Sequence, residues 1–258
     1  MPTLDVDVVP LPQLLTSDRV TGRVVVVFDV LRATSTLTTA LAAGMTEIRL
    51  HPSLDAARHA RVTTGSGALL GEHKCLKPDD FDYGNSPGQF DARPPPALGH
   101  MATTNGTRAV LQAFLLGVPH AVLVGCLLNR SAVARALCRF DAPHVTLLCA
   151  GTEGEVSFED LLGCGAVLES LDRLGVLGRV NDAGLIAAGT WASATAGLRN
   201  AARPLDALPK DLTLAFGARN LYAAGLGPDV VYAARIDTHT AVGIATRDGA
   251  DVTVRVQA

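Results

Sequence analysis

Short apolar runs alternate with helix-patterned segments along most of the chain. Residues 24–28 (Val-Val-Val-Val-Phe) form an unbroken apolar run, which is typical of a strand covered on both faces. Shorter runs predict strands at 68–71, 121–124 and 145–148, and Glu-Ile-Arg-Leu suggests another strand at 47–50. The segments between the strands predict helices at 33–43, 54–61, 112–116 and 132–140. Strands that alternate with helices in this order predict an α/β fold.

The C-terminal third carries a different pattern. Beyond Ser157 the sequence is predicted to be helical to about Arg203, and strands return at 242–245 and 252–255, on either side of the hairpin signal Asp248-Gly249. We therefore predict a layered α/β/α fold with a largely parallel or mixed sheet, whose more helical C-terminal part ends in a β-hairpin. Residues 1–258 are expected to form a single domain, and 150–155 is where a subdivision would fall.

The uncharged stretch from Ala109 to Asn129 raises the question of a membrane span. Gly117 and Pro119 interrupt it, so a core helix followed by a core strand is the better prediction. The first residues, 1–5, lack the charged and apolar segments of a secretory signal. We expect a cytoplasmic protein that does not bind a membrane.

Composition narrows the class of protein. Of the 258 residues, 48% are hydrophobic and 18% are charged, which excludes a disordered chain and a coiled coil. A net charge of −3 and an aromatic content of 4% argue against a nucleic-acid partner, because such partners need basic surfaces and stacking rings. The five cysteines show no C-x-x-C spacing, so they are expected to be core thiols of a reducing compartment.

Ligands of such sheets bind beyond the carboxyl ends of the strands, where the strand-to-helix loops gather. The first loop places Asp29 at the end of a buried strand, where a carboxylate needs a metal ion, an arginine or backbone amides. Thr34 and Ser35 follow at the start of a helix and predict an anion-binding turn. The alternative is a helix cap, with Arg32 as a solvated partner of Asp29.

A second loop, 101–108, has the sequence Met-Ala-Thr-Thr-Asn-Gly-Thr-Arg. Its hydroxyl and amide groups predict a donor-rich turn for a tetrahedral anion, and Arg108 could pair with the anion's oxygens. A helix cap would account for one threonine or the asparagine, but not for all of them. The candidate binding residues here are Thr103, Thr104, Asn105, Gly106, Thr107 and Arg108.

Two further loops supply acids and small polar residues. Residues 71–87 carry Glu72 and end in Gly-Asn-Ser-Pro, where Asn85 and Ser86 form either a binding segment or an ordinary turn. Residues 151–160 contain four acids, and Asp160 could complete a magnesium site, although Ser157 with Asp160 also resembles a capping box. Acids for Mg²⁺ together with donors for a phosphoryl group suit phosphoryl transfer.

Four of these segments occur in the same order as in the 2-phosphosulfolactate phosphatase family, which this chain resembles. They are residues 29–36, 84–87, 103–108 and 157–163, and the resemblance extends over roughly 5–240. It implies a Mg²⁺-dependent acid phosphatase with an α/β fold, which hydrolyses 2-phospho-3-sulfolactate to 3-sulfolactate and phosphate, a step of coenzyme M biosynthesis. The expected partner is a small anionic phosphate ester, and a homodimer is one candidate assembly.

The chain departs from the family pattern at two places. His73 stands where the family's Gly-Glu-Arg segment has its arginine, and residues 216–220 (Phe-Gly-Ala-Arg-Asn) replace a Ser-x-His-Gly segment. If either place contacts the sulfonate, the substrate of this protein differs from the family's.

Two other functions compete with this interpretation. Asp29 also resembles the nucleophile of haloacid-dehalogenase-type phosphatases, but Leu31 stands where those enzymes have their acid/base aspartate. A non-catalytic binding protein for a phosphorylated or sulfonated metabolite would need the anion-binding turns, but it would leave the acids unexplained.

The favoured mechanism is a metal-dependent attack of water on phosphorus. The predicted ligands of Mg²⁺ are Asp29, Glu72 and Asp160. Arg32 and Arg108 would neutralise the phosphoryl oxygens. The predicted catalytic residues are therefore Asp29, Arg32, Asn105 and Arg108, and the predicted substrate-binding residues are Thr34, Ser35, Asn85, Ser86, Thr103, Thr104, Gly106 and Thr107.

Overall fold

The computed structural model describes residues 3–92, 94–196 and 212–256. Its strands are β1 (Leu4–Val9), β2 (Val24–Phe28), β3 (Glu47–Leu50), β4 (Ala68–Gly71), β5 (Leu98–Ala102), β6 (Ala121–Gly125), β7 (His144–Cys149), β8 (Leu177–Val180), β9 (Gly243–Asp248) and β10 (Asp251–Val256). Its α-helices are α1 (Ala33–Ala42), α2 (Leu54–Thr64), α3 (Gly106–Leu116), α4 (Arg130–Leu137), α5 (Phe158–Arg173), α6 (Asp182–Ala196), α8 (Phe216–Ala223) and α9 (Gly227–Ala233).

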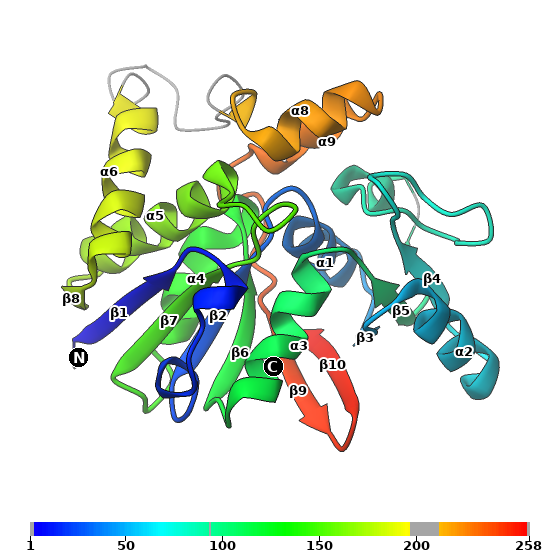
Figure 1. The fold of residues 1–258 in the computed structure, drawn as a ribbon, viewed down its shortest axis with the longest axis horizontal. Helices are drawn as coiled ribbons and strands as arrows, with labels where there is room; N and C mark the ends of the chain where they lie inside the picture. The colour runs from blue at the N-terminus through cyan, green and yellow to red at the C-terminus, as the bar shows by residue number, and fades with distance from the viewer. Residues whose placement is uncertain (1–2, 93, 197–211, 257–258) are drawn as a thin grey trace.

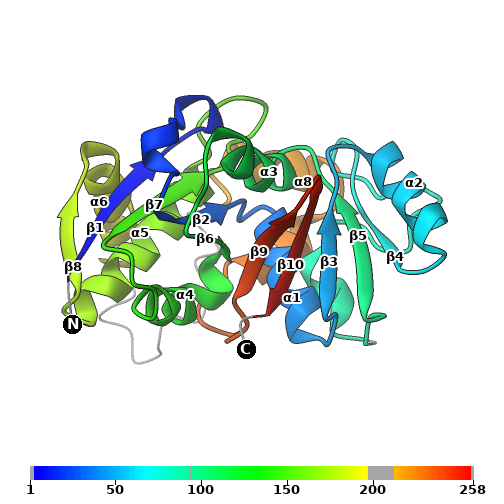
Figure 2. The ribbon, with the colours of Figure 1, turned by 90° about the horizontal axis from the view of Figure 1, so that it is seen from below.

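One mixed sheet runs through the described part of the chain, in the order β4-β5-β3-β10-β9-β6-β2-β7-β1-β8 (Figures 1 and 2). The predicted α/β class with a C-terminal hairpin is confirmed. The hairpin β9–β10 lies inside the sheet, where it joins a parallel block β4-β5-β3 to a second parallel block β6-β2-β7-β1-β8. Three successive antiparallel pairings separate the blocks, so their strands have opposite directions in the hydrogen-bonded ladder.

Although the two blocks run in opposite directions along the ladder, the twist of the sheet turns one block relative to the other. Neighbouring strands rotate by roughly 20–25°, and the rotation accumulates over the five steps between β2 and β5. The carboxyl ends of β2 and of β5 therefore come together in space, as the residues that follow them demonstrate by lining one cavity.

Strand β2 is buried on both faces, as its sequence predicts. Val24, Val26 and Phe28 pack into a hydrophobic cluster with residues of α4 and α5. Val25 and Val27 pack into a second cluster with residues of α1 and α3. Figure 2 shows α3 on one side of the sheet and α4 and α5 on the other, so the end of β2 is held rigidly between two helical layers.

The continuous helix predicted beyond Ser157 is wrong in one respect, because strand β8 separates α5 from α6. Among the described strands it pairs with β1 alone, at the edge of the sheet, and its sequence Leu-Gly-Arg-Val carries little strand signal of its own. The end of the predicted helix, 197–203, lies outside the described residues. The uncharged stretch 109–129 folds as the end of α3 followed by β6, and no helix in the described ranges is long and apolar enough to cross a membrane.

Candidate active site

A cavity of about 300 Å³ lies at the carboxyl ends of β2, β4 and β5, beneath helix α8. Figure 1 shows α8 and α9 over this end of the sheet. The cavity brings together segments that are far apart in the sequence. Its polar lining residues are Asp29, Arg32, Glu72, His73, Lys74, Asn85, Thr104, Asn105, Thr152, Glu153 and Asn220.

Asp29 is the carboxylate at the floor of this cavity, and it is 6% exposed. Burial, together with the negative charge of Glu72, raises its pKa to about 6, although the backbone amides of Ala33 and Gly106 and the Arg32 charge act in the opposite direction. The Ala33 amide donates to Asp29 Oδ1 at 3.1 Å. On the other side, a Cβ at Gly106 would lie only 2.6 Å from Asp29 Oδ2, so this glycine allows α3 to approach the carboxylate closely.

The hydroxyls that follow Asp29 support the turn and do not face the cavity. Thr34 Oγ1 donates to the Asp29 carbonyl at 2.9 Å and accepts from the Asp29 amide at 3.0 Å. Ser35 Oγ donates to the Val30 carbonyl at 2.8 Å. Both side chains are fully buried. Their local hydrogen bonds orient the backbone that carries Asp29, but neither caps α1, whose N-cap residue Arg32 makes no side-chain cap bond and is buried, not solvated.

Glu72 joins the loop after β4 to the loop after β5. Its Oε1 accepts from the amide and the hydroxyl of Thr104 at 2.9 and 2.7 Å, and its Oε2 accepts from the Cys75 amide at 3.0 Å. Glu72 and Asp29 line the same cavity, and the negative charge of Glu72 contributes to the raised pKa of Asp29. The sequence-predicted pair of acids is thus brought together.

The threonines at the start of α3 divide into two groups. The Thr103 amide donates to Thr107 Oγ1 at 3.0 Å, the Thr107 amide donates to Thr103 Oγ1 at 3.2 Å, and the two hydroxyls lie 3.3 Å apart. Both side chains are buried, so these bonds fix the turn. Thr104 and Asn105 instead line the cavity, and the Asn105 side chain does not cap the helix that it begins. Asn105 is therefore available to a ligand.

Arg32 lies in the cavity wall with a side chain that is only 3% exposed. Its Nη1 donates to Asp229 Oδ2 at 2.6 Å and to Ser86 Oγ at 3.3 Å, and its Nη2 donates to the Cys75 carbonyl at 2.6 Å. Asp229 belongs to α9, so this ion pair attaches the C-terminal helices to the floor of the site. Arg32 contributes positive charge to the cavity from a fixed position.

Two buried oxygen atoms near the site have no hydrogen-bond partner among the described residues. They are Oδ1 of Asn85 and Oε2 of Glu159. Asn85 lines the cavity and is 5% exposed. Because a buried acceptor without a partner costs free energy, the Asn85 oxygen is suited to receive a group from a ligand.

Asp160 lies below the cavity, and its two oxygens accept from backbone amides. Oδ1 accepts from Val30 at 2.9 Å and Oδ2 accepts from Gly151 at 3.1 Å. The carboxylate therefore braces the loop after β2 against the loop after β7. Within the described ranges no group of three or more His, Cys, Asp or Glu side chains is arranged to hold an ion, and Asp160 does not line the cavity with Asp29 and Glu72.

Arg108 is exposed and lines a neighbouring cavity, which also includes Arg58. Glu72, His73 and Thr104 line both cavities and form the border between them. The structure thus places the second predicted phosphoryl arginine beside the Asp29 cavity and not in it.

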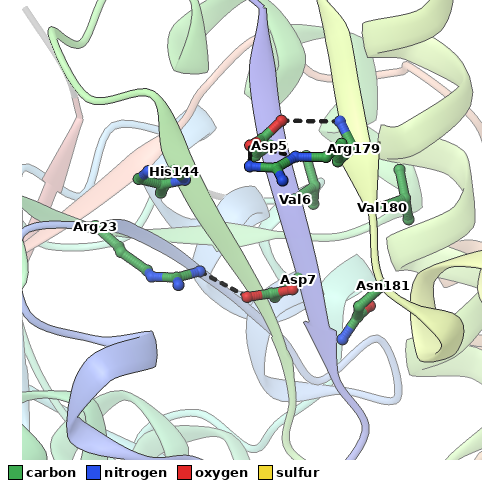
Figure 3. A pocket seen from close by; sticks show the side chains of 8 residues that line it. All are labelled: Asp5, Val6, Asp7, Arg23, His144, Arg179, Val180 and Asn181. Atoms are coloured by element: carbon green, nitrogen blue, oxygen red, sulfur yellow. Dashed lines mark hydrogen bonds and ion pairs between the residues drawn. The ribbon is translucent and has the colours of Figure 1, made fainter.

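A third cavity, also of about 300 Å³, lies at the amino-terminal halves of β1 and β7 (Figure 3). Its charges are already paired, since Arg23 binds Asp7 at 2.7 Å and Arg179 binds Asp5 at 2.8 Å. Ligands of parallel sheets bind at the opposite ends of the strands. We therefore assign the active site to the Asp29 cavity.

The sequence is similar to those of known proteins. The model of the family "2-phosphosulpholactate phosphatase" matches residues 9–248. The chain belongs to the 2-phosphosulpholactate phosphatase family. Its relatives in this family include a protein of Symbiobacterium thermophilum, 34% identical over 89% of this chain and 94% of the relative, named as a probable 2-phosphosulfolactate phosphatase. Proteins of the same name from Thermus thermophilus (35% identical, 93% of each chain) and Pseudothermotoga lettingae (31% identical, 94% of this chain and 96% of the relative) match as well.

Membership of the 2-phosphosulpholactate phosphatase family makes this protein a phosphoric monoester hydrolase, as expected. Two residues of the site were not singled out in the sequence. Asp229 is separated from its partner Arg32 by 197 positions, and no local pattern signals such a pairing. Glu159 was noted only as one of four acids, and its complete burial depends on α8, where Gly217 lies against its Oε1.

Proposed function

We propose that this phosphatase hydrolyses 2-phospho-3-sulfolactate to 3-sulfolactate and inorganic phosphate, and that it requires Mg²⁺. The names of the relatives support the substrate. The observation that carries the metal requirement is the meeting of two carboxylates, Asp29 and Glu72, in a cavity that has to receive an anionic phosphoryl group. The place of this step in coenzyme M biosynthesis stays a prediction.

The donor set of the cavity fits a hard divalent cation. Asp29 and Glu72 offer carboxylate oxygens, and the Asn85 side chain offers a buried amide oxygen without a partner among the described residues. Mg²⁺ prefers oxygen ligands and is often held by only one or two carboxylates. Asp29 and Glu72 would hold the ion, with Asp160 bracing the loop that carries Asp29. When bound, Mg²⁺ would neutralise charge on the transferred phosphoryl group.

The protein's own residues would position the ester and its attacking water. Arg32 supplies fixed positive charge at the cavity wall, and Asn105 offers an amide to a phosphoryl oxygen. Helix α8 covers the cavity and limits the access of bulk water. A water molecule then attacks phosphorus, the bond from phosphorus to the ester oxygen breaks, and the departing oxygen takes up a proton to give the hydroxyl of 3-sulfolactate.

The experiment measures phosphate release from 2-phospho-3-sulfolactate. We expect release to stop after EDTA treatment and to return with added Mg²⁺. Asp29→Asn should lose at least about 10²-fold in kcat/KM, as expected when one preorganised charged group is removed. The matched control is Asp7→Asn, because Asp7 lies in the other cavity, paired with Arg23. Full turnover in EDTA would overturn the metal requirement. Hydrolysis of other phosphate monoesters without hydrolysis of 2-phospho-3-sulfolactate would overturn the proposed substrate.

A further inference from the structure

The cavity beside the active site has a volume of about 310 Å³ and opens at the carboxyl ends of β3, β4 and β5. Glu72, His73 and Thr104 line both this cavity and the Asp29 cavity. A small ligand bound over Asp29 could therefore extend across these three residues. We call this neighbouring space the Arg108 cavity.

Two charged side chains of the Arg108 cavity already have polar partners. Arg58 is bound by Asp55 at 2.7 Å and by Asp80 at 2.7 Å. The Glu72 carboxylate accepts three hydrogen bonds from its neighbouring loops. Arg108, in contrast, has no hydrogen-bond or ion-pair partner among the residues described by the structure. Its guanidinium is therefore open to a ligand, and His73 also lines this cavity, at the border with the Asp29 cavity.

Helix α3 fixes the position of Arg108 relative to the reaction centre. Gly106 packs against Asp29 in the first turn of this helix, and Arg108 follows in the same turn. The turn itself is locked by the Thr103–Thr107 bonds. The guanidinium is therefore carried on a rigid element, at a set offset from the phosphoryl position.

We infer that the Arg108 cavity binds the second anionic group of the substrate, a sulfonate or a carboxylate, and that Arg108 determines the specificity for it. The inference rests on the proposed function, which puts the phosphoryl group over Asp29. The phosphate and the sulfonate of 2-phospho-3-sulfolactate are attached to adjacent carbons, and the two cavities share three lining residues, so one molecule would extend from one cavity into the other. Arginine is suited to this role because its planar fork donates two parallel hydrogen bonds to an oxyanion.

The test compares three phosphate monoesters in unmodified protein and in Arg108→Gln. They are 2-phospho-3-sulfolactate, 2-phospholactate, which lacks the sulfonate, and glycerol 2-phosphate, which lacks both other anions. We expect Arg108→Gln to reduce the preference for 2-phospho-3-sulfolactate over glycerol 2-phosphate, measured as the ratio of kcat/KM values, by about 10- to 100-fold, mainly through KM. An equal loss with 2-phospholactate assigns the carboxylate to this cavity, and a loss confined to the sulfonated ester assigns the sulfonate.

An unchanged ratio would overturn the inference, even if Arg108→Gln lowers all three activities, because that result would place Arg108 at the phosphoryl group. Lack of turnover of every ester by the unmodified protein would instead overturn the proposed function. Arg135→Gln is the matched control, since Arg135 lies on α4, on the other side of the sheet, and lines neither cavity. Inhibition by sulfoacetate provides a second measurement, and it should weaken in Arg108→Gln by a similar factor, whereas inhibition by inorganic phosphate should not.

Discussion

At the scale of single residues, the site buries carboxyl groups, and burial makes their ionised forms unfavourable in the folded protein. Burial is the main cause that raises the pKa of Glu159, to about 7, and the charge of Asp29 adds to it. In the unfolded chain this carboxyl titrates near 4.5. Between pH 4.5 and about pH 7, Glu159 keeps its proton in the folded protein but has lost it in the unfolded chain. The contribution of Glu159 to the free energy of unfolding therefore falls as the pH rises through this range, and it is constant above about pH 7.

Glu159→Gln should remove the share of this pH dependence that Glu159 contributes, while Asp29, whose pKa is also raised, keeps its own. We expect the variant to match the unmodified protein near pH 4 and to exceed its free energy of unfolding by up to about 3 kcal/mol above pH 7, since one pKa unit corresponds to about 1.4 kcal/mol. Urea unfolding at several pH values, in EDTA, measures the difference. A constant difference across the whole range would show that the carboxyl does not titrate in this window.

The identity of residue 31 bears on the route of the reaction. Leu31 lines the cavity beside Asp29, at the position where a nucleophilic aspartate of the dehalogenase type needs an acid. With no acid there, we expect direct attack by water, which inverts the configuration at phosphorus in a single displacement. A chiral thiophosphate ester reports the outcome. Retention of configuration, or an aspartyl phosphate trapped at Asp29, would show two displacements and a covalent intermediate.

At the scale of elements, α3 and the loop after β2 meet at one glycine. A Cβ at Gly106 would lie 2.6 Å from both the Ala33 Cβ and Asp29 Oδ2, so Gly106→Ala would force the helix away from the carboxylate. We expect a loss of about 1–3 kcal/mol in stability from overpacking, together with lower kcat. Gly189→Ala on α6 is the control: nothing lies within 4 Å of its Cβ, and the variant should gain up to about 1 kcal/mol. Equal melting temperatures for the two variants would contradict the close approach.

Helices and strands could be predicted where the local sequence pattern is enough to determine them. The bounds of β2 and β4 follow directly from apolar runs, and those of β3 follow from alternating apolar and charged residues. The edge strand β8 was not predicted, because its sequence is short and mixed, and its contacts with β1 are made across the sheet and not along the chain. The predicted hairpin forms, but its insertion between β3 and β6 is a choice among sheet partners that no local signal records.

The same limit applies to the candidate site. Asp29 stood out because a charge at the end of a buried strand needs an explanation, and the structure places it on the cavity floor. The loop threonines could not be sorted from the sequence, since a hydroxyl that caps a helix and one that faces a ligand share the same pattern. Only the packing shows that Thr107 closes a turn while Thr104 faces the cavity.

At the scale of the whole molecule, one buried ion pair connects the two ends of the chain at the site. Arg32 and Asp229 are 197 positions apart, and their side chains are only 3% and 11% exposed. Ser86 also donates to Asp229, at 2.7 Å, so the loop before β5 joins the same contact. This pair therefore adds to the core contacts that hold α8 and α9 over the cavity.

Asp229→Asn tests whether this contact holds the C-terminal helices in place. Removing one partner leaves the Arg32 charge buried without its carboxylate, which typically costs about 3–5 kcal/mol. We expect lower stability, lower kcat/KM and faster hydrogen exchange at the amides of α8 and α9 than in the unmodified protein. Asp5→Asn breaks the pair with Arg179, whose side chain is 88% exposed, and should cost far less stability than Asp229→Asn. If exchange rises equally over the whole sheet, the pair stabilises the fold in general; a rise confined to α8 and α9 identifies it as the anchor that closes the active site.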